Sequence, residues 1–445
     1  MTEGSLGKGI FFFSVPLILS NILQVLFNMA DIAVAGRFAG AAALGAVGST
    51  TTLVTLFTGF LMGLGAGVNV LVARFLGARM EGEVRRSVHT SAILCVAAGI
   101  LIALLGVFGS RWLLELLHTK PELIDGAALY LRIYFLGMPA MAVYNFGNAV
   151  FSAAGNTKKP LLFLMAAGVL NVGLNLVFVI ACQLSVAGVA LASVISQYLT
   201  AVLILTALAR ETGCWGLCRR ELRLSRDKAR AVLYLGIPSG AQNAIFAVAN
   251  LFIQTAVNSF DATMVAGNSA AANADALVYD VMAAFYTACA SFISQNYGAG
   301  RIDRVKKSFF ISMAYSFGAG AILGGALVLM GRPFLWLFTT EEAVVEAGMS
   351  RLTIMGVSYA VSAFMDCTIA AARGLGKSLA PTVIVILGSC VFRVVWVYTV
   401  FAWFRTVPSL YLLYVVSWTI TAAAELAYFA RCYRKLARGE VIPAG

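Results

Sequence analysis

Twelve apolar segments recur along the chain, each long enough to cross a lipid bilayer as a helix. A spanning helix needs about 20 predominantly apolar residues. Only 12% of the residues are charged, whereas soluble domains average about 25%. The sequence therefore predicts an all-α membrane protein with twelve transmembrane helices, near residues 10–36, 46–71, 88–109, 126–152, 160–182, 186–209, 231–258, 266–296, 308–330, 349–372, 380–404 and 409–431. The first segment is expected to remain as a span, because Met1–Gly9 is too short and too poor in charge for a signal peptide.

The Lys and Arg residues predict the orientation of these spans. If both termini are cytoplasmic, 24 of the 32 basic residues lie on the inner side, 7 lie on the outer side, and Arg393 lies inside the membrane. Basic residues concentrate in cytoplasmic loops of membrane proteins, so the sequence predicts cytoplasmic termini. The same distribution accounts for the net charge of +12 without a nucleic-acid partner.

One stretch of the first half is repeated in the second half. PLILSNILQVLFNMADIAVAG begins at Pro16, and PSGAQNAIFAVANLFIQTAVN begins at Pro238, with two asparagines in register. Asp31 aligns with Ile253, so the acidic residue occurs in one copy only. A charged side chain inside a membrane costs several kcal/mol and by default indicates a functional site.

The longest basic loop, Arg210 to Arg230, divides the chain into two halves of six spans. We predict an N-terminal lobe at 1–210, a basic cytoplasmic linker at 211–229 and a C-terminal lobe at 230–445. Halves with an even number of spans share one orientation, and transporters built this way bind substrate between the halves.

Spacing predicts one polar group in the N-terminal lobe. Asp31, Asn175 and Ser193 each lie about nine residues from an outer turn, so at 1.5 Å per residue they share a depth of roughly 13 Å. An acid among amides and a hydroxyl can hold its charged and neutral forms in different hydrogen-bond sets, as a proton carrier must. The alternative is a structural Asp satisfied by its neighbours. Asn148 is a further candidate, and Asn145, one turn nearer the middle of the membrane, can share its place.

The predicted C-terminal lobe carries three more intramembrane charges. Asp366 and Arg393 lie close to repeat equivalents of Asn148 and Asn171, so we expect them near each other, as a structural ion pair or as a gating or coupling element. Glu425 is a lone acid and a candidate cation site.

A fourth acid, Asp275, lies on the predicted span 266–296. Asp275, Tyr279, Met282 and Tyr286 follow helical spacing and are either a cation-attracting aromatic wall or ordinary packing.

Enzymatic and metal chemistry are not expected. His89 and His118 fall on opposite membrane faces, and the sequence has no H-E-x-x-H, G-x-S-x-G or P-loop pattern. Most of the eight cysteines lie in apolar segments, and the C-x3-C pair Cys214 and Cys218 has no nearby His. We predict no catalytic site, no metal site and no cofactor.

With its repeat, its P-x4-N-x6-N-x2-D pattern from Pro16, GAG-R at 298–301 and RGLGKS at 373–378, the chain resembles the multidrug and toxic compound extrusion (MATE) family, in its DinF-like prokaryotic branch of the MOP flippase superfamily. The resemblance covers nearly the whole chain. It implies a V-shaped fold of two lobes and an antiporter that exports organic cations or other amphipaths in exchange for H+ or Na+.

The resemblance also implies an ion-coupling group. Asp31 matches the family's aspartate on the first helix, Ser193 a threonine, and the amides a set of polar positions: Asn148, Asn171 and Asn175. Two departures matter. Arg74 stands where the family usually has a glutamine at the end of the second helix, and Asn175 stands where the family has a second aspartate. A sodium ion loses an anionic ligand there, whereas a proton needs only one basic oxygen, so we expect H+ coupling, with Na+ as the alternative.

These observations predict a secondary-active multidrug efflux antiporter in a prokaryotic plasma membrane. Its expected partners are small amphipathic or cationic substrates and membrane lipids, and the expected state is a monomer. The alternative is a flippase for a lipid-linked sugar or peptidoglycan precursor. That function needs a strongly cationic cavity for a pyrophosphate, whereas intramembrane acids here outnumber intramembrane arginines.

Overall fold

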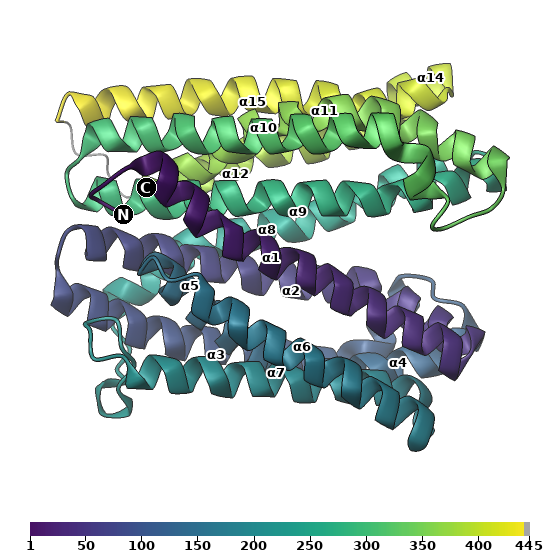
Figure 1. Cartoon of the computed structure of the whole chain (residues 1–445), viewed down its shortest axis with the longest axis horizontal. Coiled ribbons are helices and arrows are strands. Elements are labelled where there is room, and N and C mark those ends of the chain that lie inside the picture. The colour runs from purple at the N-terminus through teal and green to yellow at the C-terminus, as the bar shows by residue number, and fades with distance from the viewer. Residues whose placement is uncertain (440–445) are drawn as a thin grey trace. The chain divides into compact units, whose positions relative to one another are not determined.

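The computed structural model describes residues 1–439, whose regular structure is entirely helical (Figure 1). The elements of the first half are α1 (Leu6–Val34), η1 (Ala35–Ala39), α2 (Ala41–Gly77), α3 (Glu81–Leu116), α4 (Pro121–Phe135), α5 (Met138–Ala153), α6 (Lys158–Leu176), η2 (Val177–Ala181) and α7 (Ser185–Arg210). Those of the second half are η3 (Arg219–Glu221), α8 (Arg226–Val257), α9 (Ala262–Gly298), α10 (Ile302–Leu335), α11 (Glu342–Gly374), α12 (Leu379–Val385), η4 (Ile386–Val391), α13 (Phe392–Trp396), η5 (Val397–Phe401), α14 (Ala402–Phe404) and α15 (Val407–Ala437).

Within the described part of the chain, eleven helical stretches are long and apolar enough to cross a membrane, and a bent pair of helices brings the number to twelve. The predicted all-α fold with twelve spans is therefore confirmed. One span differs from the prediction, because the segment expected at 126–152 is two helices, α4 and α5, bent by 47°. Pro139 is the second residue of α5, and a proline ring clashes with the carbonyl four residues earlier, which favours a bend at this place.

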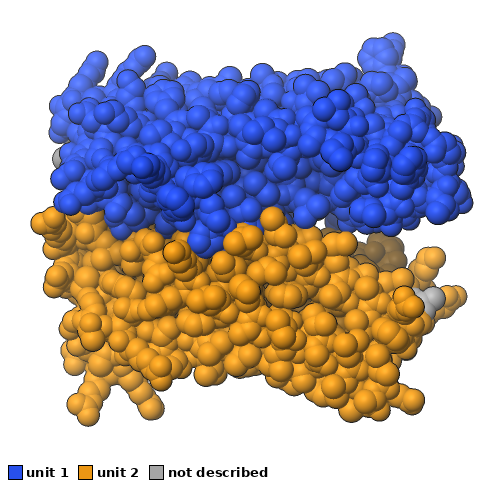
Figure 2. Space-filling view, in the orientation of Figure 1, with its two compact units in different colours: residues 1–18, 245–445 blue, residues 19–244 orange. Residues whose placement is uncertain are grey.

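The chain forms two compact units, Met1–Ile18 with Ile245–Gly445, and Leu19–Ala244 (Figure 2). The predicted division at 1–210, 211–229 and 230–445 follows the sequence repeat, whereas these units follow helix contacts. The two descriptions differ at α1 and α8, since each of these helices contributes residues to both units.

In the unit Leu19–Ala244, α8 packs closely on α2 through glycines. Gly67 lies against Gly236, where an added Cβ would come within 2.7 Å of the Gly236 backbone nitrogen, and Gly63 lies against Gly240 in the same way. Small residues on facing helices let backbones approach closely in membrane proteins. These glycines therefore hold the first part of α8 in this unit.

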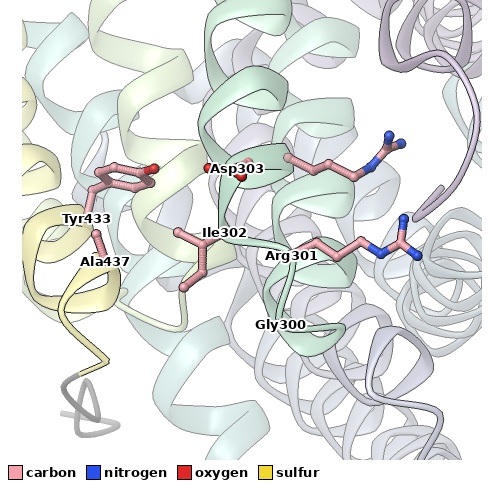
Figure 3. Close-up of a pocket in the computed structure, with 7 residues that line it drawn as sticks. Gly300, Arg301, Ile302, Asp303, Tyr433 and Ala437 are labelled. Carbon is pink, nitrogen blue, oxygen red and sulfur yellow. The ribbon is translucent and has the colours of Figure 1, made fainter.

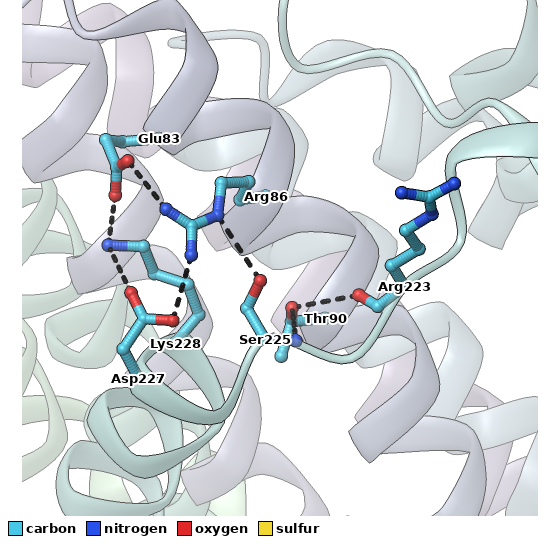
Figure 4. A network of polar contacts seen from close by, with 7 residues as sticks. All are labelled: Glu83, Arg86, Thr90, Arg223, Ser225, Asp227 and Lys228. Atoms are coloured by element: carbon cyan, nitrogen blue, oxygen red, sulfur yellow. Dashed lines mark hydrogen bonds and ion pairs between the residues drawn. The ribbon is translucent and has the colours of Figure 1, made fainter.

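The linker between α7 and α8 is docked on the first turns of α3 (Figure 4). The Thr90 hydroxyl donates to Arg223 O at 3.2 Å and accepts from Ser225 N at 3.1 Å. Arg86 pairs with Asp227 at 3.1 Å, and the buried Lys228 pairs with Glu83. His89 Nε2 accepts from the Cys218 amide at 3.0 Å. This basic segment is therefore an ordered part of the unit, held by hydrogen bonds and ion pairs.

In the other unit, α9, α10, α11 and α15 pack together, and the first turns of α1 join them. Phe13 packs edge-on against Phe292 of α9, with ring centroids 5.6 Å apart. Arg304 donates to the backbone carbonyls of Met1 and Gly4 at 3.2 and 3.0 Å. The amino-terminal residues are thus tied to the start of α10.

Candidate functional site

Four residues predicted for the N-terminal lobe meet in one hydrogen-bonded group. Asp31 comes from the last turn of α1, Asn171 and Asn175 from α6, and Ser193 from α7. Asn175 Nδ2 donates to Asp31 Oδ1, and Ser193 Oγ lies 3.0 Å from Asp31 Oδ2. Asn171 closes the group, since its Oδ1 lies 3.3 Å from Asn175 Nδ2 and its Nδ2 lies 3.5 Å from Ser193 Oγ. We call these four residues the Asp31 group.

Three of the four residues of the Asp31 group are buried, and Asp31 itself is partly exposed. Asn175 is fully buried, and Asn171 and Ser193 are each 6% exposed. Hydrogen bonds to a charged acceptor are about twice as strong as bonds between neutral groups, so the two donors stabilise an ionised Asp31. The Asn175 side-chain oxygen is buried and has no hydrogen-bond partner among the described residues.

Two π-helical turns adjoin the Asp31 group. α1 passes into η1 four residues after Asp31, and α6 passes into η2 two residues after Asn175. The two turns also contact each other. Single π-helical turns inside α-helices are frequent at functional sites. Here each one begins just beyond a polar residue of the group.

Asn148 does not join the group. It is half-buried on α5, and no hydrogen bond connects it to the four residues in the part of the chain that the structure describes. Its alternative, Asn145, donates to Met141 O at 3.1 Å within its own helix. The predicted set of five is therefore a set of four in this structure.

Asp366 and Arg393 do not form the ion pair that was one of the two expectations for them. The Tyr279 hydroxyl donates to Asp366 Oδ1 at 3.3 Å, and Arg393 Nε donates to Ser417 Oγ at 3.1 Å. No salt bridge joins them among the described residues. Both border one apolar cluster, since Arg393 lies over Trp418 and Met365, the residue before Asp366, packs in the same cluster as Trp418. Each side chain instead forms a hydrogen bond with a residue on a helix packed beside its own.

The buried ion pair of this unit is instead Asp275 with Arg351, which the sequence analysis missed. Arg351 is 7% exposed and pairs with both Asp275 and Asn268. The Tyr359 hydroxyl donates to Asp275, and the Tyr411 hydroxyl donates to Asn268 Oδ1 at 2.8 Å. Arg351 is one of the seven basic residues that the predicted orientation places on the outer side, although it lies nine residues inside α11. Counted from the starts of α9 and α11 in the structure, the two charges lie within about 6 Å of one depth. The predicted span 349–372 put Arg351 at its edge, so this signal became visible only once the true start of α11 was known.

The four residues predicted to form an aromatic wall on α9 do not share one surface in the structure. Asp275 is neutralised by Arg351, and Met282 is fully buried in the core. Tyr279 and Tyr286 remain a pair, with ring centroids 6.1 Å apart and Tyr279 40% exposed. The helical spacing was correct, but the helix turns Met282 toward α11 and the core.

Glu425 is the most isolated acid in the described part of the chain. It is fully buried on α15, and neither carboxylate oxygen has a hydrogen-bond partner there. Within residues 1–439 no group of three or more His, Cys, Asp or Glu side chains is placed to hold a metal ion.

A pocket of about 510 Å³ lies apart from these residues, between the start of α10 and the end of α15 (Figure 3). Its lining includes Arg301, Asp303, Arg304 and Tyr433. In the close-up Arg301 points away from Tyr433, and it donates to the Thr2 carbonyl at 2.8 Å. None of the predicted site residues lines this pocket.

Comparison with known proteins gives matches over most of the chain. The MatE family profile matches residues 16–177 and again residues 238–399, which places Pro16 opposite Pro238 and confirms the repeat. The probable multidrug resistance protein YoeA of Bacillus subtilis is 26% identical over 86% of this chain and 84% of that protein, and YpnP of the same organism is 28% identical over 80% of each. A multidrug resistance MATE family transporter of the MOP superfamily, solved in an outward-facing conformation, superimposes with a TM-score of 0.91 at 21% identity, over 98% of this chain and 97% of that one.

Proposed function

We propose, because this chain belongs to the MATE family of membrane transporters, that it is a secondary-active multidrug antiporter of a prokaryotic plasma membrane, with both termini in the cytoplasm. Its substrates are small organic cations and amphipaths, and H+ is the coupling ion. The family is one of transporters, so the chain is a transport protein and not an enzyme. The names of the two Bacillus relatives support efflux of drugs.

One observation carries the proposal for H+: every donor to the Asp31 carboxylate has a second acceptor within reach. The Ser193 hydroxyl lies 3.0 Å from Asp31 Oδ2 and 3.1 Å from Val189 O. Asn175 Nδ2 contacts Asp31 and also lies 3.3 Å from Asn171 Oδ1. The two side chains can therefore donate to an ionised Asp31, or release it and donate elsewhere when it is protonated.

A protonated Asp31 would itself need an acceptor, and Asn175 supplies one. Its side-chain oxygen has no other hydrogen-bond partner among the described residues, and rotation of the amide by half a turn exchanges its donor for this acceptor. Both protonation states of Asp31 can thus be hydrogen-bonded at one place. A group that has to take up and release a proton in each cycle needs this property.

The same residues are less well suited to binding Na+. Hard cations are held by several oxygens, usually with carboxylates among them. The Asp31 group offers five side-chain oxygens but one negative charge. A second unit charge at about 4 Å would add roughly 4 kcal/mol of attraction at an effective dielectric constant of about 20. We therefore expect Asn175→Asp to increase the dependence of export on Na+.

The test is transport of the cationic dye ethidium in reconstituted vesicles under an imposed pH gradient or an imposed Na+ gradient, applied separately with the membrane potential clamped. Asp31→Asn keeps the shape of the side chain and removes its titratable group, so dye transport should fall to that of protein-free vesicles. The matched control is Asp261→Asn, since Asp261 caps α9 by accepting from Met264 N at 2.9 Å and Asn caps a helix equally well.

Two results would overturn the proposal. Undiminished gradient-driven transport by a folded Asp31→Asn protein would show that Asp31 is not the proton-coupling residue. Transport that runs on an inward Na+ gradient at equal pH, with no response to a pH gradient alone, would replace H+ by Na+.

A further inference from the structure

The pocket of about 510 Å³ between the start of α10 and the end of α15 combines polar and apolar walls (Figure 3). Ile302 and Ala437 give it apolar surface, whereas the exposed Asp303 and the half-buried Tyr433 give it a carboxylate and a hydroxyl. In the close-up the Tyr433 hydroxyl points toward Asp303. Neither side chain forms a hydrogen bond or a salt bridge with another residue in the described part of the chain, so both are free to bind a ligand. Small-molecule sites have volumes of about 300–1,000 Å³, and this pocket is within that range.

The pocket is closed on its inner side by the packing of α10 on α15. The rings of Phe309 and Phe429 lie 4.6 Å apart between their centroids, and Val305 and Leu436 are buried in the same apolar cluster. Phe309 follows Ile302 by six residues along α10. The pocket is therefore a recess at one end of this helix pair.

The lipid-facing surface of α10 begins just beyond the pocket. Phe310 is 55% exposed, and it follows Asp303 by seven residues, which places it on the same helix face about 10 Å further along. Phe317, another seven residues on, is also exposed. The polar region of a bilayer is about 5–8 Å thick on each side of the hydrocarbon. Asp303 and Tyr433 therefore lie at the level of the lipid headgroups.

The surroundings of the pocket are strongly basic. Residues 300–307 and 433–438 contain one acid, Asp303, and seven basic residues, which are Arg301, Arg304, Lys306, Lys307, Arg434, Lys435 and Arg438. Arg301 and Arg304 donate to the carbonyls of Thr2 and Gly4, so they act on the pocket through their charge. The other five are exposed, and their long side chains can reach a ligand. Basic pockets between membrane helices on the cytoplasmic side bind anionic lipid headgroups, and the predicted orientation puts this end of α10 in the cytoplasm.

We propose that this pocket binds an anionic phospholipid whose headgroup also carries hydroxyl groups, of which phosphatidylglycerol is the simplest. The Tyr433 hydroxyl donates to the phosphate, the exposed Lys and Arg side chains neutralise it, and one lipid tail lies along α10 at Phe310. Asp303 accepts from a headgroup hydroxyl. A carboxylate repels a bare phosphate, so an anionic ligand fits beside Asp303 only if it also brings a hydrogen-bond donor. The proposal is independent of the export function, because it follows from the pocket and its charges.

The experiment compares phospholipids that differ only in the headgroup. Phosphatidylglycerol is anionic and carries hydroxyls, phosphatidylmethanol has the same charge without a hydroxyl, and phosphatidylethanolamine is zwitterionic. Native mass spectrometry of the purified full-length protein in detergent measures the dissociation constant of each lipid. Phosphatidylglycerol should bind about fivefold or more tightly than phosphatidylmethanol, and phosphatidylethanolamine should bind most weakly. Inorganic phosphate in millimolar excess should not displace the lipid, because the tail contributes to binding.

Two substitutions separate the roles of the lining residues. Asp303→Ala removes the acceptor for the hydroxyl, so the affinities for the two anionic lipids should become equal within about twofold. The lost negative charge acts on both lipids alike and leaves this ratio unaffected. Tyr433→Phe should weaken both anionic lipids by about fivefold and keep the preference between them. The matched control is Glu81→Ala, at an exposed acid in the first turn of α3 that is predicted to face the same side, and it should leave the preference unchanged.

The order of lipid affinities decides the outcome. Thermal unfolding reports whether each variant is folded, and where one is not, the wild-type order decides alone. Equal wild-type affinities for phosphatidylglycerol and phosphatidylmethanol, tighter binding of phosphatidylethanolamine, or a preference that survives Asp303→Ala would overturn the proposal. Displacement of the lipid by inorganic phosphate would overturn it as well and would assign the pocket to a soluble anion.

Discussion

Asp275 and Arg351 are expected to contribute to stability mainly through their mutual neutralisation. Arg351 is 7% exposed, and its charge is met by Asp275 from α9. Asp275→Asn leaves this cation without an ion-pair partner, and breaking a buried pair from one side typically costs about 3–5 kcal/mol. We expect a clear fall in the unfolding temperature of the detergent-solubilised protein.

The double variant Asp275→Asn with Arg351→Met tests the reason for that fall. It removes both charges, so much of the loss should be recovered, because an apolar replacement of a buried pair is often neutral. A double variant that is less stable than Asp275→Asn alone would contradict this account and would assign the stability to the hydrogen bonds of Asn268 and Tyr359.

At the scale of residues, the sequence predicted polar groups well where depth could be counted from a turn. Asp31, Asn175 and Ser193 were placed at one depth, and they contact one another. The sequence-based prediction failed where the hydrogen-bond partner of a side chain depends on how two helices are rotated against each other. The rotation of α9 gives Asp366 a tyrosine as its partner and puts Met282 in the core, and a one-dimensional pattern does not specify it.

At the scale of elements, close packing of α2 on α8 leads to a prediction for glycines. A Cβ on Gly63 would come within 2.6 Å of the Ser239 backbone carbon, and backbone cannot move aside as a side chain can. Gly63→Ala should therefore destabilise the protein, by about 1–3 kcal/mol as is typical of overpacking. Thermal unfolding of the variant in detergent measures this.

Gly48 on the same helix is the matched control. An added Cβ there meets nothing within 4 Å, and Ala is favoured over Gly inside a helix by about 1 kcal/mol. Gly48→Ala should be neutral or stabilising. If Gly63→Ala unfolds at the same temperature as Gly48→Ala, the close approach of α2 and α8 does not contribute to stability as proposed.

The helices themselves were predictable because each must present about 20 apolar residues to lipid. What hydropathy could not predict is their interruptions. The break between α4 and α5, and the π-helical turns η1 and η2, keep the apolar composition unchanged. They arise from local backbone causes, such as Pro139, and from the packing of one element on another. The two π-helical turns adjoin the Asp31 group, so hydropathy does not describe the backbone at this candidate site.

At the scale of the whole molecule, the remaining prediction is the orientation in the membrane. Cytoplasmic termini place 24 of the 32 Lys and Arg residues on the inner side, where basic residues concentrate in membrane proteins. Two native cysteines test it without new substitutions on the surface. Cys182, at the turn before α7, and Cys218, in the linker before η3, are both exposed, and they are predicted to face opposite sides.

An impermeant maleimide added to intact cells should label Cys182 and leave Cys218 unmodified, because only the former is predicted to face outward. Both should react after the cells are permeabilised, which shows that Cys218 is reactive when reached. Cys182→Ser and Cys218→Ser identify the modified residue by loss of the corresponding label. The orientation follows from one charge count over the whole chain, so labelling of Cys218 but not Cys182 in intact cells would invert every loop together, including the linker that Thr90 and Arg86 hold on α3.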